Sequence, residues 1–241
     1  MRIAVWSDPA VDWTALDAVI VRSTWDYFDR PDEFRAWVER VAPTVAFFNP
    51  ADVVLWNAHK GYLRDLGERG VPVVDTTWVA AGETAEVPYA EAVVKPAVSG
   101  GSQGLYRARE GDRIDAEQDT LVQPLLASIA DEGELSLLYA GGELSHTVRK
   151  VPAAGDIRSQ PEFGSDVRLE DAPGEALEAA RVVLDAVGRE LLYARVDLVR
   201  AADGTLRLIE LEVIEPQLYL RWDPASPARF ASALAAAARP A

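Results

Sequence analysis

The sequence contains no cysteine and only two histidines, His59 and His146. Without cysteine the chain has no disulfide framework, no thiolate metal site and no cysteine nucleophile. So few histidines also argue against a multi-histidine metal centre and against a histidine-based catalytic triad.

Basic residues are scarce as well: 24 Lys and Arg stand against 39 Asp and Glu, for a formal net charge of −15. This balance argues against a nucleic-acid partner, because non-specific affinity comes mainly from contacts of Lys and Arg with phosphates. No apolar run approaches the roughly 20 residues that span a bilayer. Residues 1–6 are too short for a signal peptide. We therefore expect a cytoplasmic protein without a membrane partner.

Apolar residues make up 49% of the 241 residues, which is enough for a sizeable core in one large or two small domains. Residues 2–6, 18–21 and 45–48 are predicted to be strands, and residues 32–41 a helix. The strand–helix–strand order is typical of a small parallel sheet. The buried face of that helix is predicted to carry Phe34, Trp37, Val38 and Val41.

Beyond residue 90 the predicted strands form antiparallel pairs, so we expect a domain boundary between residues 75 and 90. Further helices are predicted over 57–68, 176–190 and 230–238. The second of these should bury Leu177, Ala180, Leu184 and Val187. Residues 71–74 are expected to be extended, and residues 92–95 and 121–123 are expected to be strands. Two hairpins are predicted: one joins residues 134–139 to 143–147, and the other joins residues 193–199 to 206–213.

The last hairpin carries an unusual set of charges. If Asp203 and Gly204 form a two-residue turn, Asp197 faces Glu210 and Arg195 faces Glu212. Side chains alternate along a strand, so these four groups share one face, and Leu206 and Leu208 should lie on it too. Opposed like charges destabilise a sheet, and Mg²⁺ would relieve them. The alternative is a solvated face with a single Arg–Glu pair.

A glycine-rich segment, residues 99–104, follows the strand that ends at Lys95 and Pro96. Three glycines and two serines allow the backbone N–H groups to approach a phosphate closely. The segment fits neither the P-loop nor the dinucleotide-binding fingerprint, and by itself it is equally explained as a simple turn. Together with the strand-ending Lys95 and the acidic hairpin, it indicates a triphosphate site.

The order of these predicted elements and motifs along residues 16–234 resembles that of the ATP-grasp ligases, and in particular that of the glutathione-synthetase-like branch. Within that branch, residues 22–27 and 210–220 look closest to the O-ureido-D-serine cyclo-ligase-like proteins. The resemblance implies an α/β (α+β) ATP-grasp fold that binds ATP with Mg²⁺, or with Mn²⁺ as the alternative ion. It implies nucleotide contacts from Lys60, Lys95, Ser99, Gly100, Gly101, Ser102, Gly104, Gln123, Leu125 and Glu134.

The strongest match lies at the metal. The family pattern of Arg-x-Asp followed by Glu-x-Asn and a later Pro is filled by Arg195, Asp197, Glu210, Glu212 and Pro216. Glu212 replaces the usual Asn and adds a charge, which leaves the number of metal ions open. The resemblance also implies catalytic roles for Arg195, Lys150 and Arg158. Substrate contacts are implied for Arg22, Ser23, Trp25 and Asp26, although the last two could equally belong to a packed turn.

By this resemblance, residues 1–80 form an N-terminal substrate domain with a shortened parallel sheet. Residues 81–241 form the ATP-grasp domain, with a lid at about 88–126 and a C-terminal subdomain at about 127–241. The expected activity is ADP-forming ligation of a carboxylate to an amine through an acylphosphate on a small amino-acid-like substrate. Ring closure within one molecule, a nucleotide-binding protein without ligase activity, a small-molecule kinase and a homodimer are left open.

Overall fold

The computed structural model describes residues 2–238 of the chain. Its N-terminal part contains β1 (Ala18–Ile20) and β2 (Ala46–Phe48), which pair in parallel and are joined through α1 (Pro31–Val41). The predicted buried face of α1 is confirmed. The predicted strand over residues 2–6 is wrong: no strand forms there, and Ile3 and Val5 are 94% and 60% exposed. Only Trp6 of that stretch enters the core, where its ring packs edge-on against Phe34.

The helix predicted over residues 57–68 is two helices, α2 (Ala51–Asn57) and α3 (Tyr62–Glu68). The chain turns between them because hydrogen bonds outside the helices hold it. The Lys60 N–H donates to the Ala97 carbonyl at 2.8 Å, and the Gly61 N–H donates to His59 Nδ1 at 3.0 Å. Lys60 therefore lies in the turn between α2 and α3, where its backbone is bonded to Ala97.

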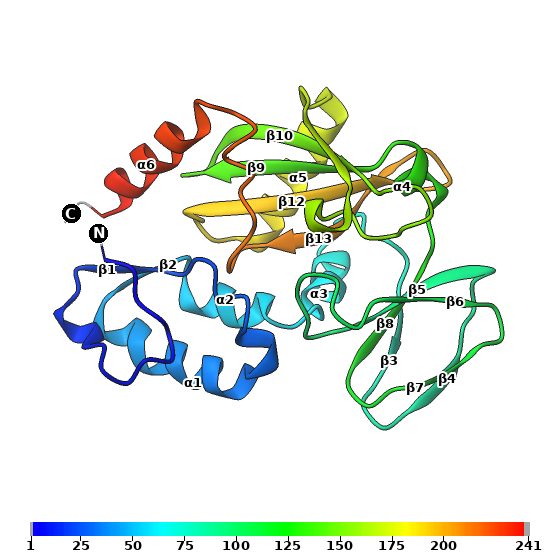
Figure 1. Cartoon of the computed structure of the whole chain (residues 1–241), viewed down its shortest axis with the longest axis horizontal. Helices are drawn as coiled ribbons and strands as arrows, with labels where there is room; N and C mark the ends of the chain where they lie inside the picture. The colour runs from blue at the N-terminus through cyan, green and yellow to red at the C-terminus, as the bar shows by residue number, and fades with distance from the viewer. Residues whose placement is uncertain (1, 239–241) are drawn as a thin grey trace.

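A four-stranded antiparallel sheet holds the two predicted strands of the middle segment. Its order is β3 (Thr77–Val79), β8 (Thr120–Pro124), β5 (Glu91–Pro96) and β6 (Tyr106–Arg109). A separate pair, β4 (Thr84–Glu86) and β7 (Arg113–Asp115), closes its far end. In Figure 1 this unit lies at the lower right, beneath the larger sheet.

The larger sheet has five antiparallel strands in the order β11-β10-β9-β12-β13. The predicted hairpins are confirmed as β9 (Glu134–Ala140) with β10 (Glu143–Val151) and β12 (Tyr193–Arg200) with β13 (Leu206–Glu212); β11 is Asp166–Leu169. The short helix α4 (Ala127–Asp131) connects β8 to β9, and four 3₁₀ turns lie elsewhere in the described part of the chain. This sheet carries the acidic residues that the sequence singled out.

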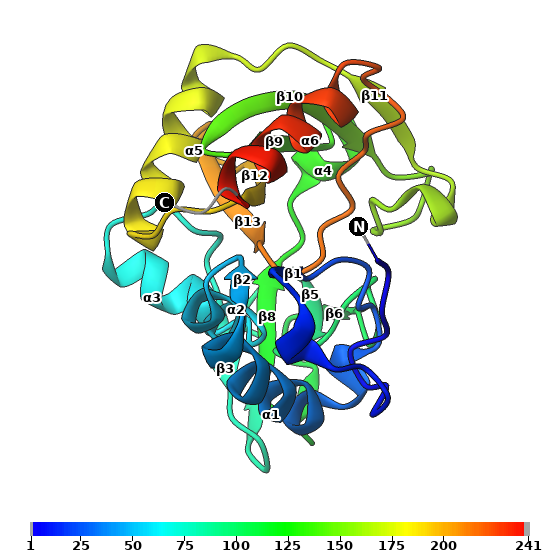
Figure 2. The same cartoon turned by 90° about the vertical axis from the view of Figure 1, so that its left-hand side faces the viewer.

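Two helices cover opposite faces of the five-stranded sheet. α5 (Gly174–Val187) packs on the face that carries Val196, Leu198 and Leu211, and α6 (Ser226–Ala237) packs through Phe230 on Leu138 and Tyr193. Figure 2 shows α6 in front of the sheet and above β1. The predicted face of α5 is partly wrong, since Ala176 and Val183 are buried whereas Leu177 is 38% exposed.

The turn of the acidic hairpin differs from the prediction, but the predicted pairs are correct. The Ala201 N–H donates to the Thr205 carbonyl, so the turn holds three residues rather than two. A bulge at Ile209 adds one residue to β13 and restores the pairing of Asp197 with Glu210 and of Arg195 with Glu212. The bulge also turns Leu208 to the opposite face, where it packs in the core, so the predicted common face of Leu208 and Glu210 is wrong.

Two buried asparagines attach the N-terminal part to this hairpin. Asn49 Nδ2 donates to the carbonyls of Tyr193 and Val213 at 2.8 Å each, and its Oδ1 accepts from the Leu192 N–H at 2.6 Å. Asn57 bonds Leu211 and Val213 in the same manner. Within residues 2–238, no helix is long and apolar enough to cross a membrane.

We predict that Asn49→Ala lowers the free energy of unfolding by about 2–4 kcal/mol, because it leaves buried carbonyls and an N–H without partners. Urea unfolding followed by circular dichroism measures the change. The exposed Gln118, replaced by Ala, is the control and should change stability by less than about 0.5 kcal/mol. Equal effects of the two substitutions would contradict the role given to Asn49.

Candidate active site

A cavity of about 720 Å³ lies where the two larger sheets meet the break between α2 and α3. It is walled by β5 and β8 on one side and by β9, β10, β12 and β13 on the other. Segment 99–105 lines it as well. Of the residues singled out from the sequence, it is lined by Trp25, Lys60, Lys95, Ser99, Gly100, Gly101, Ser102, Gln123, Leu125, Glu134, Lys150, Arg195, Glu210 and Glu212.

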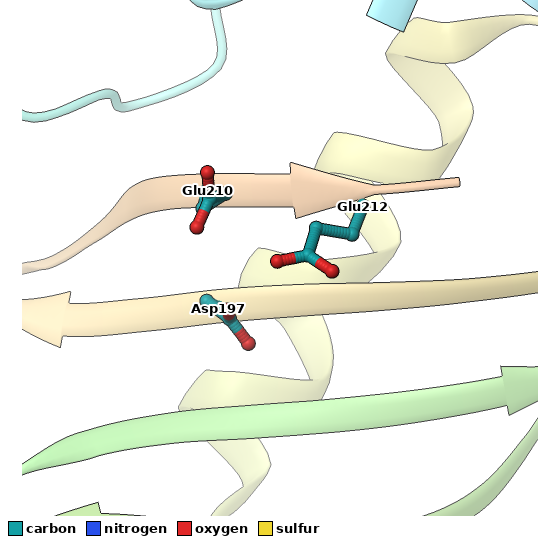
Figure 3. A group of neighbouring side chains, drawn as sticks. All are labelled: Asp197, Glu210 and Glu212. Atoms are coloured by element: carbon teal, nitrogen blue, oxygen red, sulfur yellow. The ribbon is translucent and has the colours of Figure 1, made fainter. Parts of the chain in front are cut away.

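Three carboxylates form a cluster at this cavity: Glu210 and Glu212 line it, and Asp197, which does not line it, is buried beside them. Asp197 projects from β12, and Glu210 and Glu212 project from the neighbouring β13 (Figure 3). One oxygen of each lies within 4.8 Å of the others. The bulge at Ile209 makes this possible, because it brings Glu210 opposite Asp197.

Asp197 is the most enclosed of the three. Its Oδ1 accepts from Ser136 Oγ at 2.6 Å, and its Oδ2 accepts from Arg195 Nη2 at 2.8 Å. Burial alone would raise the pKa of the Asp197 carboxyl, but the charges of Arg195 and Lys150 outweigh it and hold that pKa well below its usual range. Asp197 is therefore a permanent anion.

Glu212 behaves differently. It pairs with Arg195, but burial raises its pKa to about 7, with further repulsion from Glu210 and Asp197. Glu210 lies 3.6 Å from Lys60, and the charges of Lys60 and Lys95 lower its pKa against the effect of burial. Glu212 is thus the one of these three carboxylates whose pKa the neighbouring cations do not lower below its usual value.

The lysines of the cavity are held in place by these acids. Lys150 Nζ lies 2.7 Å from Glu134 and 3.2 Å from Asp197, and both contacts are buried. Lys60 Nζ donates to the Ser99 carbonyl at 2.8 Å. Lys95 is buried with no ion pair among residues 2–238, and burial lowers its pKa. Three ammonium groups thereby border one cavity and can receive phosphate oxygens.

The donor set fits a hard divalent cation. Mg²⁺ prefers carboxylate oxygens and completes its shell with water and phosphate oxygens. The three oxygens are close enough to share one ion, whose charge would offset both the burial of Glu212 and its repulsion by Glu210 and Asp197. Asp197, Glu210 and Glu212 would hold such an ion between the cavity wall and a nucleotide.

Segment 99–104 lines the cavity through its first five residues. Gly101, Ser102 and Gly104 have positive φ angles of 57°, 63° and 72°. Ser102 Oγ donates to Gln160 Oε1 at 2.8 Å, so the segment is fastened to the opposite wall. A Cβ on Gly100 would lie 2.5 Å from Phe28 Cε1, which leaves room only for glycine there.

The strand predicted to hold the base occupies the far wall. Gln123 is buried, and its Nε2 donates to Thr76 Oγ1 at 2.9 Å. The Leu125 N–H donates to the Glu91 carbonyl at 2.9 Å, so its carbonyl is the backbone group left for a ligand. Glu134 shares its carboxylate between Lys150 and Ser159.

Some of the predicted residues lie away from the cavity. Arg158 forms an ion pair with Asp156 at 2.7 Å and stacks 3.7 Å over the Phe163 ring. Asp26 accepts from Trp6 Nε1 and pairs with Arg30, as in the packed turn that the sequence left as an alternative. Ser23 and Gly104 do not line the cavity either, and Arg22 is enclosed behind its wall.

Sequence reasoning missed several residues of the site. Ser136 and Ser159 hold Asp197 and Glu134, and Gln160 fastens the glycine-rich segment. The Tyr62 hydroxyl accepts from the Leu211 N–H at 3.0 Å. No local motif marks these residues, because each is brought in by an element distant in sequence. Glu215, three residues beyond Glu212, also lines the cavity.

Comparisons with known proteins place this site in a family. The profile of the D-cycloserine synthetase DcsG N-terminal domain matches residues 1–49. The cycloserine biosynthesis protein DcsG of Streptomyces lavendulae is 34% identical over 270 residues, covering 99% of this chain and 89% of that protein. The crystal structure of D-cycloserine synthetase DcsG superimposes with a TM-score of 0.83 at 30% identity, covering 97% and 88%.

More distant structures share the fold. ATP-grasp ligase PsnB, solved with a phosphomimetic precursor variant, Mg and ADP, gives a TM-score of 0.61 at 18% identity over 90% of this chain and 70% of that one. The D-alanyl-alanine synthetase A of Vibrio cholerae gives 0.59 at 15% identity, covering 92% and 76%. The fold is therefore the ATP-grasp fold, and ligases of this class use ATP and Mg²⁺.

The fold and the site together define an ATP-grasp ligase, an ATP-dependent enzyme that forms a carbon–nitrogen bond. Within this class the chain belongs to the D-cycloserine synthetase DcsG family. The resemblance drawn from the sequence motifs is thereby confirmed.

The raised pKa of Glu212 gives a pH prediction for the metal-free protein. Its folded pKa of about 7 exceeds the unfolded value of 4.5, so its stabilising contribution is full below pH 4.5 and is lost as the pH rises through 7. Glu212→Gln should therefore gain stability relative to the unmodified chain between pH 5 and 8, by on the order of 2 kcal/mol.

Chemical denaturation in EDTA at several pH values measures this difference. Saturating Mg²⁺ should stabilise the unmodified chain more than the Gln variant, because only the former keeps all three carboxylates. If the difference in stability between the Gln variant and the unmodified chain did not change with pH, the raised pKa assigned to Glu212 would be wrong. Glu117→Gln, at an exposed acid, is the control.

Proposed function

We propose that this chain is an ADP-forming ligase that closes a ring within a small amino acid, joining its carboxylate to a nitrogen of the same molecule. The observation that carries the proposal is the cluster of three carboxylates, two of which line a cavity that is also lined by three lysines, in a chain whose relative is named for cycloserine synthesis. A cavity of about 720 Å³ has room for a nucleotide and a small amino acid.

The nucleotide is proposed to lie between the four-stranded sheet and the acidic hairpin. Its base would meet Gln123 and the Leu125 carbonyl, and its phosphates would meet Lys60, Lys95 and Lys150. Mg²⁺ on the three carboxylates would supply charge neutralisation at the phosphates. Support comes from PsnB, whose structure of the same fold was solved with Mg and ADP.

The chemistry is proposed in two steps. The substrate carboxylate attacks the γ-phosphorus in line, which gives an acylphosphate and ADP; the internal nitrogen then attacks the acyl carbon and releases phosphate. No residue forms a covalent bond. Arg195, which borders the cavity between Asp197 and Glu212, is placed to stabilise the transferred phosphoryl group, while the segment at residues 99–104 excludes water.

The domain division is part of the same proposal. β3 pairs with β8, so the unit that carries the nucleotide would begin by Thr77, slightly before the boundary expected at residue 80. The four-stranded sheet with β4 and β7 would form the lid. The parallel pair β1–β2 with α1 would form the substrate side.

The test is turnover of O-ureido-D-serine with ATP and Mg²⁺, measured as ADP release and as a cyclised product by mass spectrometry. We expect both, in equal amounts, and a loss of at least about 100-fold with Glu210→Gln, because the ion would lose a ligand. ADP release without a cyclised product would instead favour a kinase. Mg²⁺-dependent ATP binding without ADP release would favour a nucleotide-binding protein.

A second prediction concerns the glycine-rich segment. Gly100→Ala should weaken ATP binding about 10-fold or more, since its Cβ would meet Phe28 at 2.5 Å and push the segment off the cavity. Isothermal titration with a non-hydrolysable ATP analogue measures the dissociation constant. Adding Phe28→Ala should restore most of the affinity. If the double variant binds as weakly as the single one, steric contact is not the cause.

A further inference from the structure

Glu215 is a buried acid that the mechanism above does not use. It is 9% exposed and lines the cavity just beyond Glu212. Within residues 2–238 its carboxylate forms no hydrogen bond and no ion pair. Only its backbone carbonyl is engaged, accepting from Trp25 Nε1 at 3.2 Å. Glu215 is therefore an unpartnered polar side chain at the wall of the cavity.

At the substrate end of the cavity, near Glu215, the sequence predicts a positively charged residue. The sequence assigned Arg22 to the substrate, but the structure encloses its guanidinium behind the wall. Arg22 Nη2 donates to the Pro216 carbonyl at 2.8 Å, and the guanidinium lies 5.2 Å over the Tyr193 ring. The substrate end of the cavity thus presents an acid in front of an arginine, rather than the arginine itself.

An isolated buried carboxylate is unfavourable unless a cation or hydrogen-bond donors satisfy it. Burial raises the pKa of Glu215 well above its usual range, and the charge of Glu212 adds to the rise. Arg22 and Lys60 oppose this effect, but neither forms an ion pair with it. The partner of the Glu215 carboxylate must therefore be a ligand bound in the cavity.

A metal ion is not the partner that the geometry favours. The carboxylates that can share an ion are Asp197, Glu210 and Glu212, and Glu215 is not among those whose oxygens lie within 4.8 Å of one another. The remaining candidate for the partner of Glu215 is an organic cation beside the reacting carboxylate of the substrate. In an α-amino acid the ammonium and the carboxylate share one carbon atom, so the ammonium lies directly beside the group that is phosphorylated.

We propose that Glu215 binds the α-ammonium group of the substrate and selects α-amino acids over the corresponding hydroxy acids. This inference rests on the proposed function of the site and deepens it. Arg22 is the positioning residue: it holds the backbone at Pro216, next to Glu215, from behind.

The first experiment separates recognition from chemistry. Glu215→Gln keeps the shape of the side chain and removes its charge. We expect the KM for the amino-acid substrate to rise about 10- to 100-fold, as for a lost hydrogen bond to a charged group, with the KM for ATP and kcat changed less than about 3-fold. A fall in kcat with an unchanged KM for the amino acid would overturn the proposal.

The second experiment does not depend on turnover. With Mg²⁺ and ADP present, D-serine should raise the Tm of the unmodified chain more than D-glycerate, which carries a hydroxyl in place of the ammonium. Glu215→Gln should remove this difference, whereas Glu117→Gln, at an exposed acid, should retain it. Equal shifts by the two ligands in the unmodified chain, or no shift by D-serine, would overturn the proposal. Failure of the proposed function alone appears separately, as D-serine binding in this assay without ADP release from ATP and O-ureido-D-serine in the turnover assay.

Discussion

The buried carboxylate of Asp197 is the interaction on which the rest of the site depends. It lies in the central strands of the five-stranded sheet, and Ser136, Lys150 and Arg195 all bond to it. Removing a charge of this kind from water is costly unless its partners are complete. The partners come from β9, β10 and β12, so satisfying one anion orders three strands and orients both a lysine and an arginine toward the cavity.

The same logic explains why the site is charged throughout yet stable. Each lysine that would receive a phosphate is held by an acid or a carbonyl: Lys150 by Glu134 and Asp197, and Lys60 by Glu210 and Ser99. Lys95 is the one left to burial alone within the described chain. A nucleotide with its ion would exchange these partners rather than add unpaired charge, because its phosphates meet the lysines as the ion meets the carboxylates.

Much of this could be predicted from the sequence because it depends on local pattern. Alternation along β13 gives the common face of Glu210 and Glu212, and the spacing of Phe34, Trp37, Val38 and Val41 gives the buried face of α1. The predicted pairing of Asp197 with Glu210 is correct only because the bulge at Ile209 offsets the third residue of the turn. Errors arose where a long-range bond overrides the pattern. The Lys60 N–H bond to Ala97 breaks a continuous helical pattern, and the bulge at Ile209 moves Leu208 to the other face.

The substrate end shows the limit of such reasoning most clearly. A motif assigns a residue type to a position, but whether that residue reaches the ligand depends on the wall in front of it. Arg22 lies two residues beyond β1 and bonds the Pro216 carbonyl in the segment after β13, and it is Glu215 of that segment, not Arg22, that lines the cavity. The sign of the charge that meets the substrate is therefore decided by packing between segments about 190 residues apart.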